Sequence, residues 1–173
     1  MKRFLVILLA LALTATVSSA GFAAEEKETV KYGSNVGDNF KPFTLTDPVK
    51  HKSVALASML GKKKNTILFF MNTTCSLCLA EEKMFLESWD KMKDKVNLLL
   101  LSVDFDPSRI EGYAKSMEIP FTILHDPEGE VLGNAGFTGT PALVVIDAEG
   151  KIKEKISGYD QNAVKGYIKK LTR

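Results

Sequence analysis

Continuous apolar runs of strand length recur along the chain and are separated by amphipathic segments of helical length. Such runs are typical of strands that are buried on both faces of a sheet. The predicted strands are residues 66–71, 96–103, 120–124, 142–146 and 151–156, and the predicted helices are 76–93, 106–117, 130–135 and 161–171. This alternation predicts an α/β fold, with a central mixed β-sheet flanked by helices.

Two shorter apolar pieces precede the first long run. Residues 40–46 alternate in the way of a short edge strand or hairpin arm, and residues 54–60 form the second piece. We therefore expect an N-terminal β-hairpin extension ahead of the main sheet. The lysine run that follows, within residues 61–65, predicts a solvated turn rather than a basic patch.

The N-terminus has the order of a secretory signal peptide. Lys2 and Arg3 precede an apolar run over 4–17, and small residues follow it. Cleavage after Ala20 or Ala23 fits this pattern, so we predict a signal peptide over 1–23, with an uncleaved membrane anchor as the alternative. Either outcome implies export to the periplasm or another extracytoplasmic compartment, where disulfide chemistry persists.

Length and charge narrow the picture further. The chain has 173 residues, which predicts one domain, placed at 36–173 after a polar linker over 24–35. Its net charge of +2 is accounted for by Lys2 and Arg3, so the domain itself is neutral. A neutral domain has no electrostatic footprint for nucleic acid, and we expect no such partner.

The only two cysteines, Cys75 and Cys78, form one Cys-Ser-Leu-Cys unit. A structural disulfide framework would use more cysteines, spread along the chain. A structural zinc site needs four ligands, and only the isolated His51 and His125 could complete one. We therefore expect neither a metal nor a cofactor, and we interpret the pair as reactive.

Cys75 follows a buried strand and opens a helix. Backbone N–H groups and the helix dipole stabilise an anion there, so we expect a lowered pKa and a nucleophilic thiolate. Cys78, one helical turn on, can attack a mixed disulfide formed on Cys75 and release the partner in its reduced form. An inert structural disulfide and a short metal-binding motif are the alternatives.

A second candidate element, residues 136–141, ends in Thr140 and Pro141 just before a predicted strand. Proline is unusual at the entrance to a buried strand. A cis Thr140–Pro141 bond would turn the chain tightly and leave the Thr140 backbone free to pair with an extended peptide. The spacing fits a trans turn equally well.

These motifs together resemble the thioredoxin superfamily, in particular its TlpA/ResA/DsbE group of exported thiol–disulfide oxidoreductases. The resemblance covers residues 36–171 and is carried by Leu60-Gly61-Lys62, Cys75-Ser-Leu-Cys78, Glu81, Thr140-Pro141 and Asp147-Ala-Glu-Gly150. It implies that the first cysteine is an exposed nucleophile and the second a buried resolving thiol. It also implies that the proline is cis and packs against the pair, and that the glutamate helps to move protons.

The chain departs from the group's pattern at two positions. Thr74 stands where tryptophan is usual, and Leu77 where proline is frequent. The dipeptide between the cysteines tunes the relative stability of thiolate and disulfide, so the reduction potential does not carry over from the family.

Glu81 lies three residues after Cys78, on nearly the same helix face. Partial burial would raise its pKa and let it accept a proton. The alternative is a solvent-facing carboxylate, which is what we expect of Glu82 next to it.

The resemblance implies a reductase that acts on oxidised exported proteins such as apocytochrome c and takes electrons from a membrane thiol donor. One alternative is a metallochaperone that holds copper(I) with the two thiols, although such chaperones of this fold use a wider cysteine spacing and a histidine. Another is a peroxiredoxin-like peroxidase, but that class needs Pro and Thr where Leu68 and Asn72 stand.

Overall fold

The computed structural model describes residues 30–61 and 64–172. The predicted signal peptide over 1–23 lies outside these ranges, as does half of the predicted linker over 24–35. Within the described ranges, none of the helices has the length and apolar character that a membrane crossing requires.

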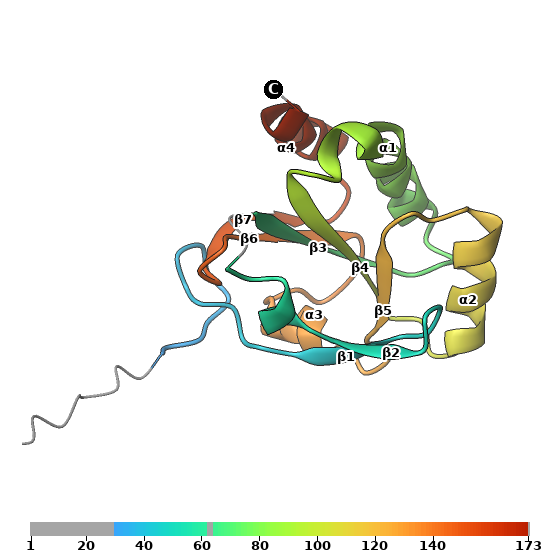
Figure 1. Cartoon of the computed structure of the whole chain (residues 1–173), viewed down its shortest axis with the longest axis horizontal. Coiled ribbons are helices and arrows are strands. Elements are labelled where there is room, and N and C mark those ends of the chain that lie inside the picture. The colour runs from blue at the N-terminus through green and yellow to red at the C-terminus, as the bar shows by residue number, and fades with distance from the viewer. Residues whose placement is uncertain (1–29, 62–63, 173) are drawn as a thin grey trace, which may run out of the picture.

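The fold is built on one seven-stranded sheet with the strand order β2-β1-β5-β4-β3-β6-β7 (Figure 1). The strands β3, β4 and β5 are parallel, whereas β6, β7, β1 and β2 join them in antiparallel pairs. The strands are β1 (Thr44–Asp47), β2 (Lys52–Ala55), β3 (Asn65–Met71), β4 (Val96–Ser102), β5 (Thr122–His125), β6 (Ala142–Ile146) and β7 (Ile152–Ser157). The predicted mixed α/β fold is confirmed.

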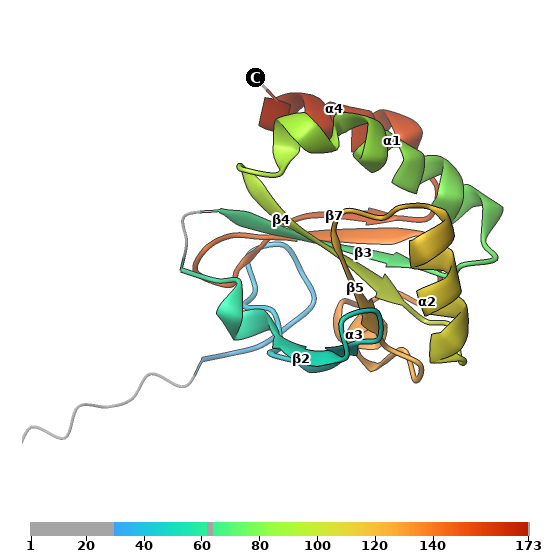
Figure 2. The same cartoon turned by 45° about the vertical axis from the view of Figure 1, so that its right-hand side comes forward.

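Helices cover both faces of this sheet. They are α1 (Ser76–Met92), α2 (Pro107–Ser116), α3 (Glu130–Asn134) and α4 (Gln161–Thr172), with a short 3-10 helix η1 at Leu56–Ser58. The helices α1 and α4 lie side by side over one face, and α3 lies on the other, as Figure 2 shows.

Strand β3 supplies the centre of the core on both faces, because its side chains alternate with a period of two. Ile67, Phe69 and Met71 pack with the helices α1, α2 and α4. Leu68 and Phe70 point the other way, toward α3 and η1. All five are wholly buried, and each burial stabilises the fold by about 1.5–3 kcal/mol. This rigid strand fixes the position of the chain that follows it.

The predicted N-terminal hairpin is present, but its strands are shorter than the apolar segments 40–46 and 54–60 from which it was predicted. Its arms β1 and β2 pair from Thr44↔Ala55 to Asp47↔Lys52. Phe40 precedes the first arm and is buried by packing in the core instead of by pairing. The second arm ends at Ala55, and Leu56 beyond it turns into η1 and is buried there.

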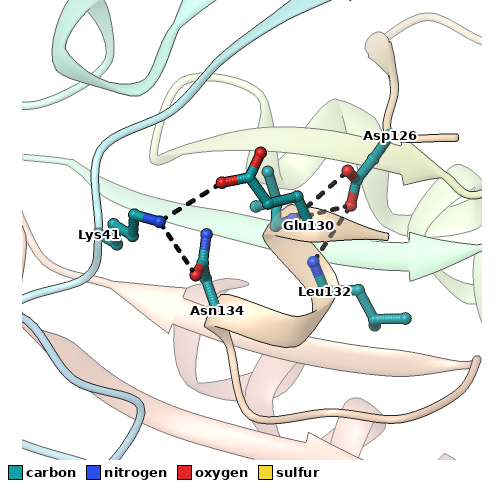
Figure 3. A network of polar contacts seen from close by, with 6 residues as sticks. Lys41, Asp126, Glu130, Leu132 and Asn134 are labelled. Atoms are coloured by element: carbon teal, nitrogen blue, oxygen red, sulfur yellow. Dashed lines mark hydrogen bonds and ion pairs between the residues drawn. The ribbon is translucent and has the colours of Figure 1, made fainter. Parts of the chain in front are cut away.

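The short helix α3 is fixed by a buried carboxylate. Asp126 accepts hydrogen bonds from the backbone N–H groups of Val131, at 3.1 Å, and Leu132, at 3.1 Å (Figure 3). Lys41 in turn donates to the Glu130 carboxylate, at 3.4 Å, and the N-terminal segment is thereby joined to this helix.

Part of the predicted linker is bonded to the domain. Tyr32 forms an isolated β-bridge with Asn39, and the Lys155 ammonium donates to the Ser34 carbonyl at 2.7 Å. The N–H of Gly37 donates to the carbonyl of Ile152 at 2.8 Å. These contacts place residues 32–39 beside β7, near the start of β3.

Candidate active site

Cys75 and Cys78 form a disulfide at the junction of β3 and α1. Cys75 is the N-cap of α1, with extended backbone angles, and its sulfur accepts a hydrogen bond from the Cys78 N–H at 3.1 Å. Cys75 is half-buried, whereas Cys78 is wholly buried. A partner molecule can therefore reach the first sulfur but not the second.

The loop between β3 and Cys75 is held by Asp104, a residue to which no motif in the sequence points. Its buried carboxylate accepts hydrogen bonds from the Thr73 N–H and hydroxyl, each at 2.8 Å, and from the Ser102 hydroxyl at 2.6 Å. The one available signal was an acidic residue directly after a buried strand. Asp104 thus ties the end of β4 to the loop that carries the disulfide.

The same loop also turns upon itself. The Asn72 side-chain oxygen accepts from the Thr74 N–H at 3.0 Å and from the Thr74 hydroxyl at 2.6 Å. The Asn72 carbonyl accepts from the Cys75 N–H at 3.0 Å. These bonds fix the direction in which the chain enters α1, and hence the orientation of Cys75.

Pro141 lies at the same end of the sheet as the disulfide. The Thr140–Pro141 peptide bond is cis. Ala142 pairs with Phe70 of β3, so Pro141 lies level with the last residue of that strand. Its carbonyl accepts from the Gly158 N–H at 3.0 Å, which joins the entrance of β6 to the loop before α4.

Glu81 is buried, with only 1% of its surface exposed. Its carboxylate accepts a hydrogen bond from the Asp160 N–H at 2.7 Å, at the start of α4. Burial raises the pKa of Glu81 above its usual value, and the bond from Asp160 opposes that rise. The carboxyl thus lies one helical turn after Cys78 along α1, where α1 contacts α4.

The prediction that Glu82 faces solvent is wrong. Glu82 is also only 1% exposed, because α2 packs beside α1 and covers this position. The Tyr113 hydroxyl of α2 donates to its carboxylate at 2.5 Å. Burial raises the pKa of Glu82 to about 7, although the hydrogen bond from Tyr113 acts in the opposite direction.

The two histidines lie in different parts of the sheet, His125 at the end of β5 and His51 in the turn between β1 and β2. The His125 Nε2 lies 2.9 Å from the Asp104 carbonyl oxygen, and His51 is exposed in the β1–β2 turn. Over 30–61 and 64–172, no group of three or more His, Cys, Asp or Glu side chains is arranged to hold a metal ion.

Three exposed apolar side chains lie in α1 or in segments that are bonded to α1 or to the loop before it. Leu77 lies between the cysteines and is 49% exposed, Phe105 is 86% exposed, and Tyr159 is 43% exposed. Phe105 directly follows Asp104, which bonds the loop before Cys75, and Tyr159 directly precedes Asp160, which bonds Glu81. The three side chains therefore belong to three segments joined to the start of α1.

The fold and the site together define a thioredoxin-like protein with a CxxC disulfide at the N-terminus of a helix. The chain matches the AhpC/TSA family over residues 36–155, and it belongs to that family.

Named relatives extend this assignment. The chain is 26% identical over 173 residues to the thiol-disulfide oxidoreductase ResA of Bacillus cereus, which covers 99% of this chain and 95% of the relative. The resemblance to the ResA and DsbE group is confirmed, and so is the predicted class of thiol–disulfide oxidoreductase.

Solved structures agree on the fold. The thioredoxin domain of a thiol-disulfide oxidoreductase from Bacteroides vulgatus matches with a TM-score of 0.69 and 21% identity, covering 80% of this chain and 99% of that one. The peroxidoxin BcpB of Mycobacterium tuberculosis matches with a TM-score of 0.69 and 20% identity, covering 80% and 96%. At these identities the likeness concerns the fold alone.

Proposed function

We propose that the chain is an exported thiol–disulfide oxidoreductase that reduces disulfides in exported partner proteins through the Cys75–Cys78 couple. The observation that carries this proposal is the disulfide at the start of α1, with one sulfur accessible and the other wholly buried. Such an asymmetric pair suits an attacking thiol and a resolving thiol.

The reaction begins with the reduced pair. The Cys75 thiolate attacks one sulfur of the partner's disulfide, and the other sulfur leaves as a thiolate and takes up a proton. Cys78 then loses its proton and attacks the Cys75 sulfur. The Cys75–partner bond breaks, the Cys75–Cys78 bond forms, and two electrons have passed to the partner. Glu81, one turn beyond Cys78, is the proposed acceptor of the Cys78 proton.

The direction of electron flow is tested by the reduction potential of the couple. The protein is equilibrated against defined thiol buffers, and free thiols are trapped. We expect a value near that of thioredoxin, about −270 mV, as suits a reductant. A value near about −120 mV would instead make the protein an oxidant of its partners. A pair that does not exchange at all would make the disulfide structural.

Export is supported by the N-terminal sequence, which has the order of a secretory signal peptide. The proposed partners are oxidised exported proteins, apocytochrome c among them, and the electrons come from a membrane thiol donor. N-terminal sequencing of the protein purified from cells tests the leader. A new N-terminus after residue 20 or 23 is expected for cleavage, and an intact Met1 indicates an anchor.

A peroxidase is the second candidate, since the match to the AhpC/TSA family favours it. Against it, Leu68 and Asn72 occupy the places where that class needs Pro and Thr. Consumption of hydrogen peroxide by the reduced protein separates the two functions. We expect no consumption beyond that of the Cys75→Ser variant.

A further inference from the structure

Glu82 has a buried carboxyl group that the proposed reaction does not use. One oxygen accepts from the Tyr113 hydroxyl, and among the described residues the other has no hydrogen-bond partner. An ionised carboxylate in such a place lacks both water and a full set of donors, so its charged form is disfavoured. Burial therefore moves the protonation of this group toward neutral pH, where a solvated carboxylate stays ionised.

Its place on α1 brings it close to the redox pair. Glu82 lies four residues after Cys78, and side chains at that spacing are neighbours on a helix surface. Cys78 is wholly buried, as is the strand residue Phe69 beneath α1. Cys75 is half-buried, but the side of α1 that joins the couple to Glu82 is buried, so water screens a negative charge on the couple less than it would at the surface.

The titratable groups around this carboxyl are few. Helix α1 itself contributes Cys78 and Glu81, and α2 contributes Tyr113. On the side of α4, Asp160 bonds Glu81 rather than Glu82. The strand faces beneath α1 are apolar. Burial and the adjacent carboxyl raise the pKa of Tyr113, so its hydroxyl stays protonated and remains a donor.

We propose that Glu82 is proton-linked to the Cys75–Cys78 couple: it takes up a proton when the disulfide is reduced and releases that proton when the disulfide reforms. The inference rests on the proposed function, because it concerns the same couple. In the reduction, an external dithiol is oxidised to a disulfide and supplies two electrons. The Cys78 sulfur takes one proton, Cys75 remains a thiolate, and Glu82 takes a second proton that offsets the thiolate charge.

The direct test is a titration of the Glu82 carboxyl carbon by NMR in both redox states. The reduced state is prepared with a phosphine, so the test does not depend on thiol exchange. The signal is assigned by its loss in Glu82→Gln. We expect a higher titration midpoint in the reduced protein than in the oxidised protein. Equal midpoints in the two states overturn the linkage, even if the couple exchanges with thiols as proposed.

The pH dependence of the reduction potential is the second readout. Between the two titration midpoints, reduction of the couple takes up one further proton. The equilibrium constant for reduction then changes up to tenfold more per pH unit, and the reduction potential changes by up to about 30 mV more per pH unit. In Glu82→Gln this additional dependence is lost. In Tyr113→Phe it moves to higher pH, because the hydrogen bond that lowers the pKa of Glu82 is gone.

The matched control is Glu87→Gln, which removes an exposed carboxylate from the same helix. In this variant the reduction potential should depend on pH with the same slope as in the unaltered protein. A Glu82→Gln variant that keeps this slope as well would show that Glu82 serves packing alone. A couple that exchanges with no thiol in any variant would instead refute the proposed function, whatever the NMR titration shows.

Discussion

Two adjacent glutamates of α1 point to different neighbours. Glu81 binds the start of α4 through the Asp160 N–H, and Glu82 binds α2 through Tyr113. The sequence left two interpretations open for Glu81, partial burial near Cys78 or a solvent-facing carboxylate, and the structure shows it buried. The sequence did not predict the burial of Glu82, since that depends on a second helix that packs beside α1. The periodicity of apolar residues along a helix indicates which stripe of the helix is buried. It does not indicate how far that stripe is widened by other helices that pack beside it.

The role proposed for Glu81 predicts a change in the pH–rate profile of thiol exchange. Burial raises the pKa of this carboxyl. It therefore ionises, and can accept a proton, only at a higher pH than a solvated glutamate does. Glu81→Gln should remove the rise in rate that accompanies its ionisation, a loss of about 10²-fold or more at the plateau. The measurement is the rate of disulfide reduction across pH. An unchanged profile would remove Glu81 from the mechanism.

Glu82 predicts a decline of stability with rising pH in the oxidised protein. Its pKa is raised from 4.5 to about 7 on folding, so between these values the folded state binds more protons than the unfolded state. The stabilisation is full below the unfolded-state pKa of 4.5 and is lost as the pH rises through the folded-state pKa of about 7. The free energy of unfolding falls by at most about 3 kcal/mol over this range.

Glu82→Gln should therefore show a flatter profile of unfolding free energy from pH 4 to pH 8, measured by denaturant titration. Glu87→Gln serves as the exposed control and should retain the decline. If the two variants give parallel profiles, the titration of Glu82 contributes nothing to folding.

At the scale of elements, the loop between β3 and α1 depends on Asp104 at the end of β4. Asp104→Asn replaces one acceptor oxygen by a donor and leaves a hydrogen bond from Thr73 or Ser102 without its partner. We expect a loss of about 1–3 kcal/mol in the free energy of unfolding and a changed rate of disulfide reduction by dithiothreitol.

A nearby substitution gives the comparison. Asp106 is the exposed N-cap of α2 and accepts from the Ser108 N–H. Asparagine caps helices nearly as well, so Asp106→Asn should change both quantities little. If both variants lose the same free energy of unfolding, the bonds of Asp104 do not stabilise the loop before Cys75 more than an ordinary helix cap stabilises a helix.

The long buried elements could be predicted from sequence, and the short ones only approximately. Strands β3 and β6 are continuous apolar runs, and their predicted bounds lie within one residue of the observed ones. Strand β5 begins at Thr122 rather than at residue 120, where a proline lacks the N–H for pairing. The bonds from Thr73 to Asp104 could not be predicted, because they join residues thirty-one positions apart in sequence.

At the scale of the whole molecule, three exposed apolar side chains, Leu77, Phe105 and Tyr159, lie in segments at the disulfide end of the sheet. If partner proteins bind there, Leu77→Ser and Phe105→Ser should each slow the reduction of a protein disulfide by about tenfold, from the loss of one buried side chain. Reduction of a small aromatic disulfide should change little.

The matched control for these side chains is Tyr32→Ser, which alters an exposed apolar residue at the other end of β3. It should leave both rates unchanged. Equal slowing of the small and the protein disulfide by the two site variants would indicate altered chemistry at Cys75 instead of a lost docking contact.

The described chain begins at Val30, beside the residues that precede β3, whereas Cys75 follows the far end of that strand (Figure 1). Val30 is thus separated from the disulfide by about the length of β3. A bead or an electrode coupled near Val30 would leave the reactive sulfur facing the bulk solution. The protein is therefore suited to immobilised measurements, in which two attached copies have difficulty reaching each other's disulfides.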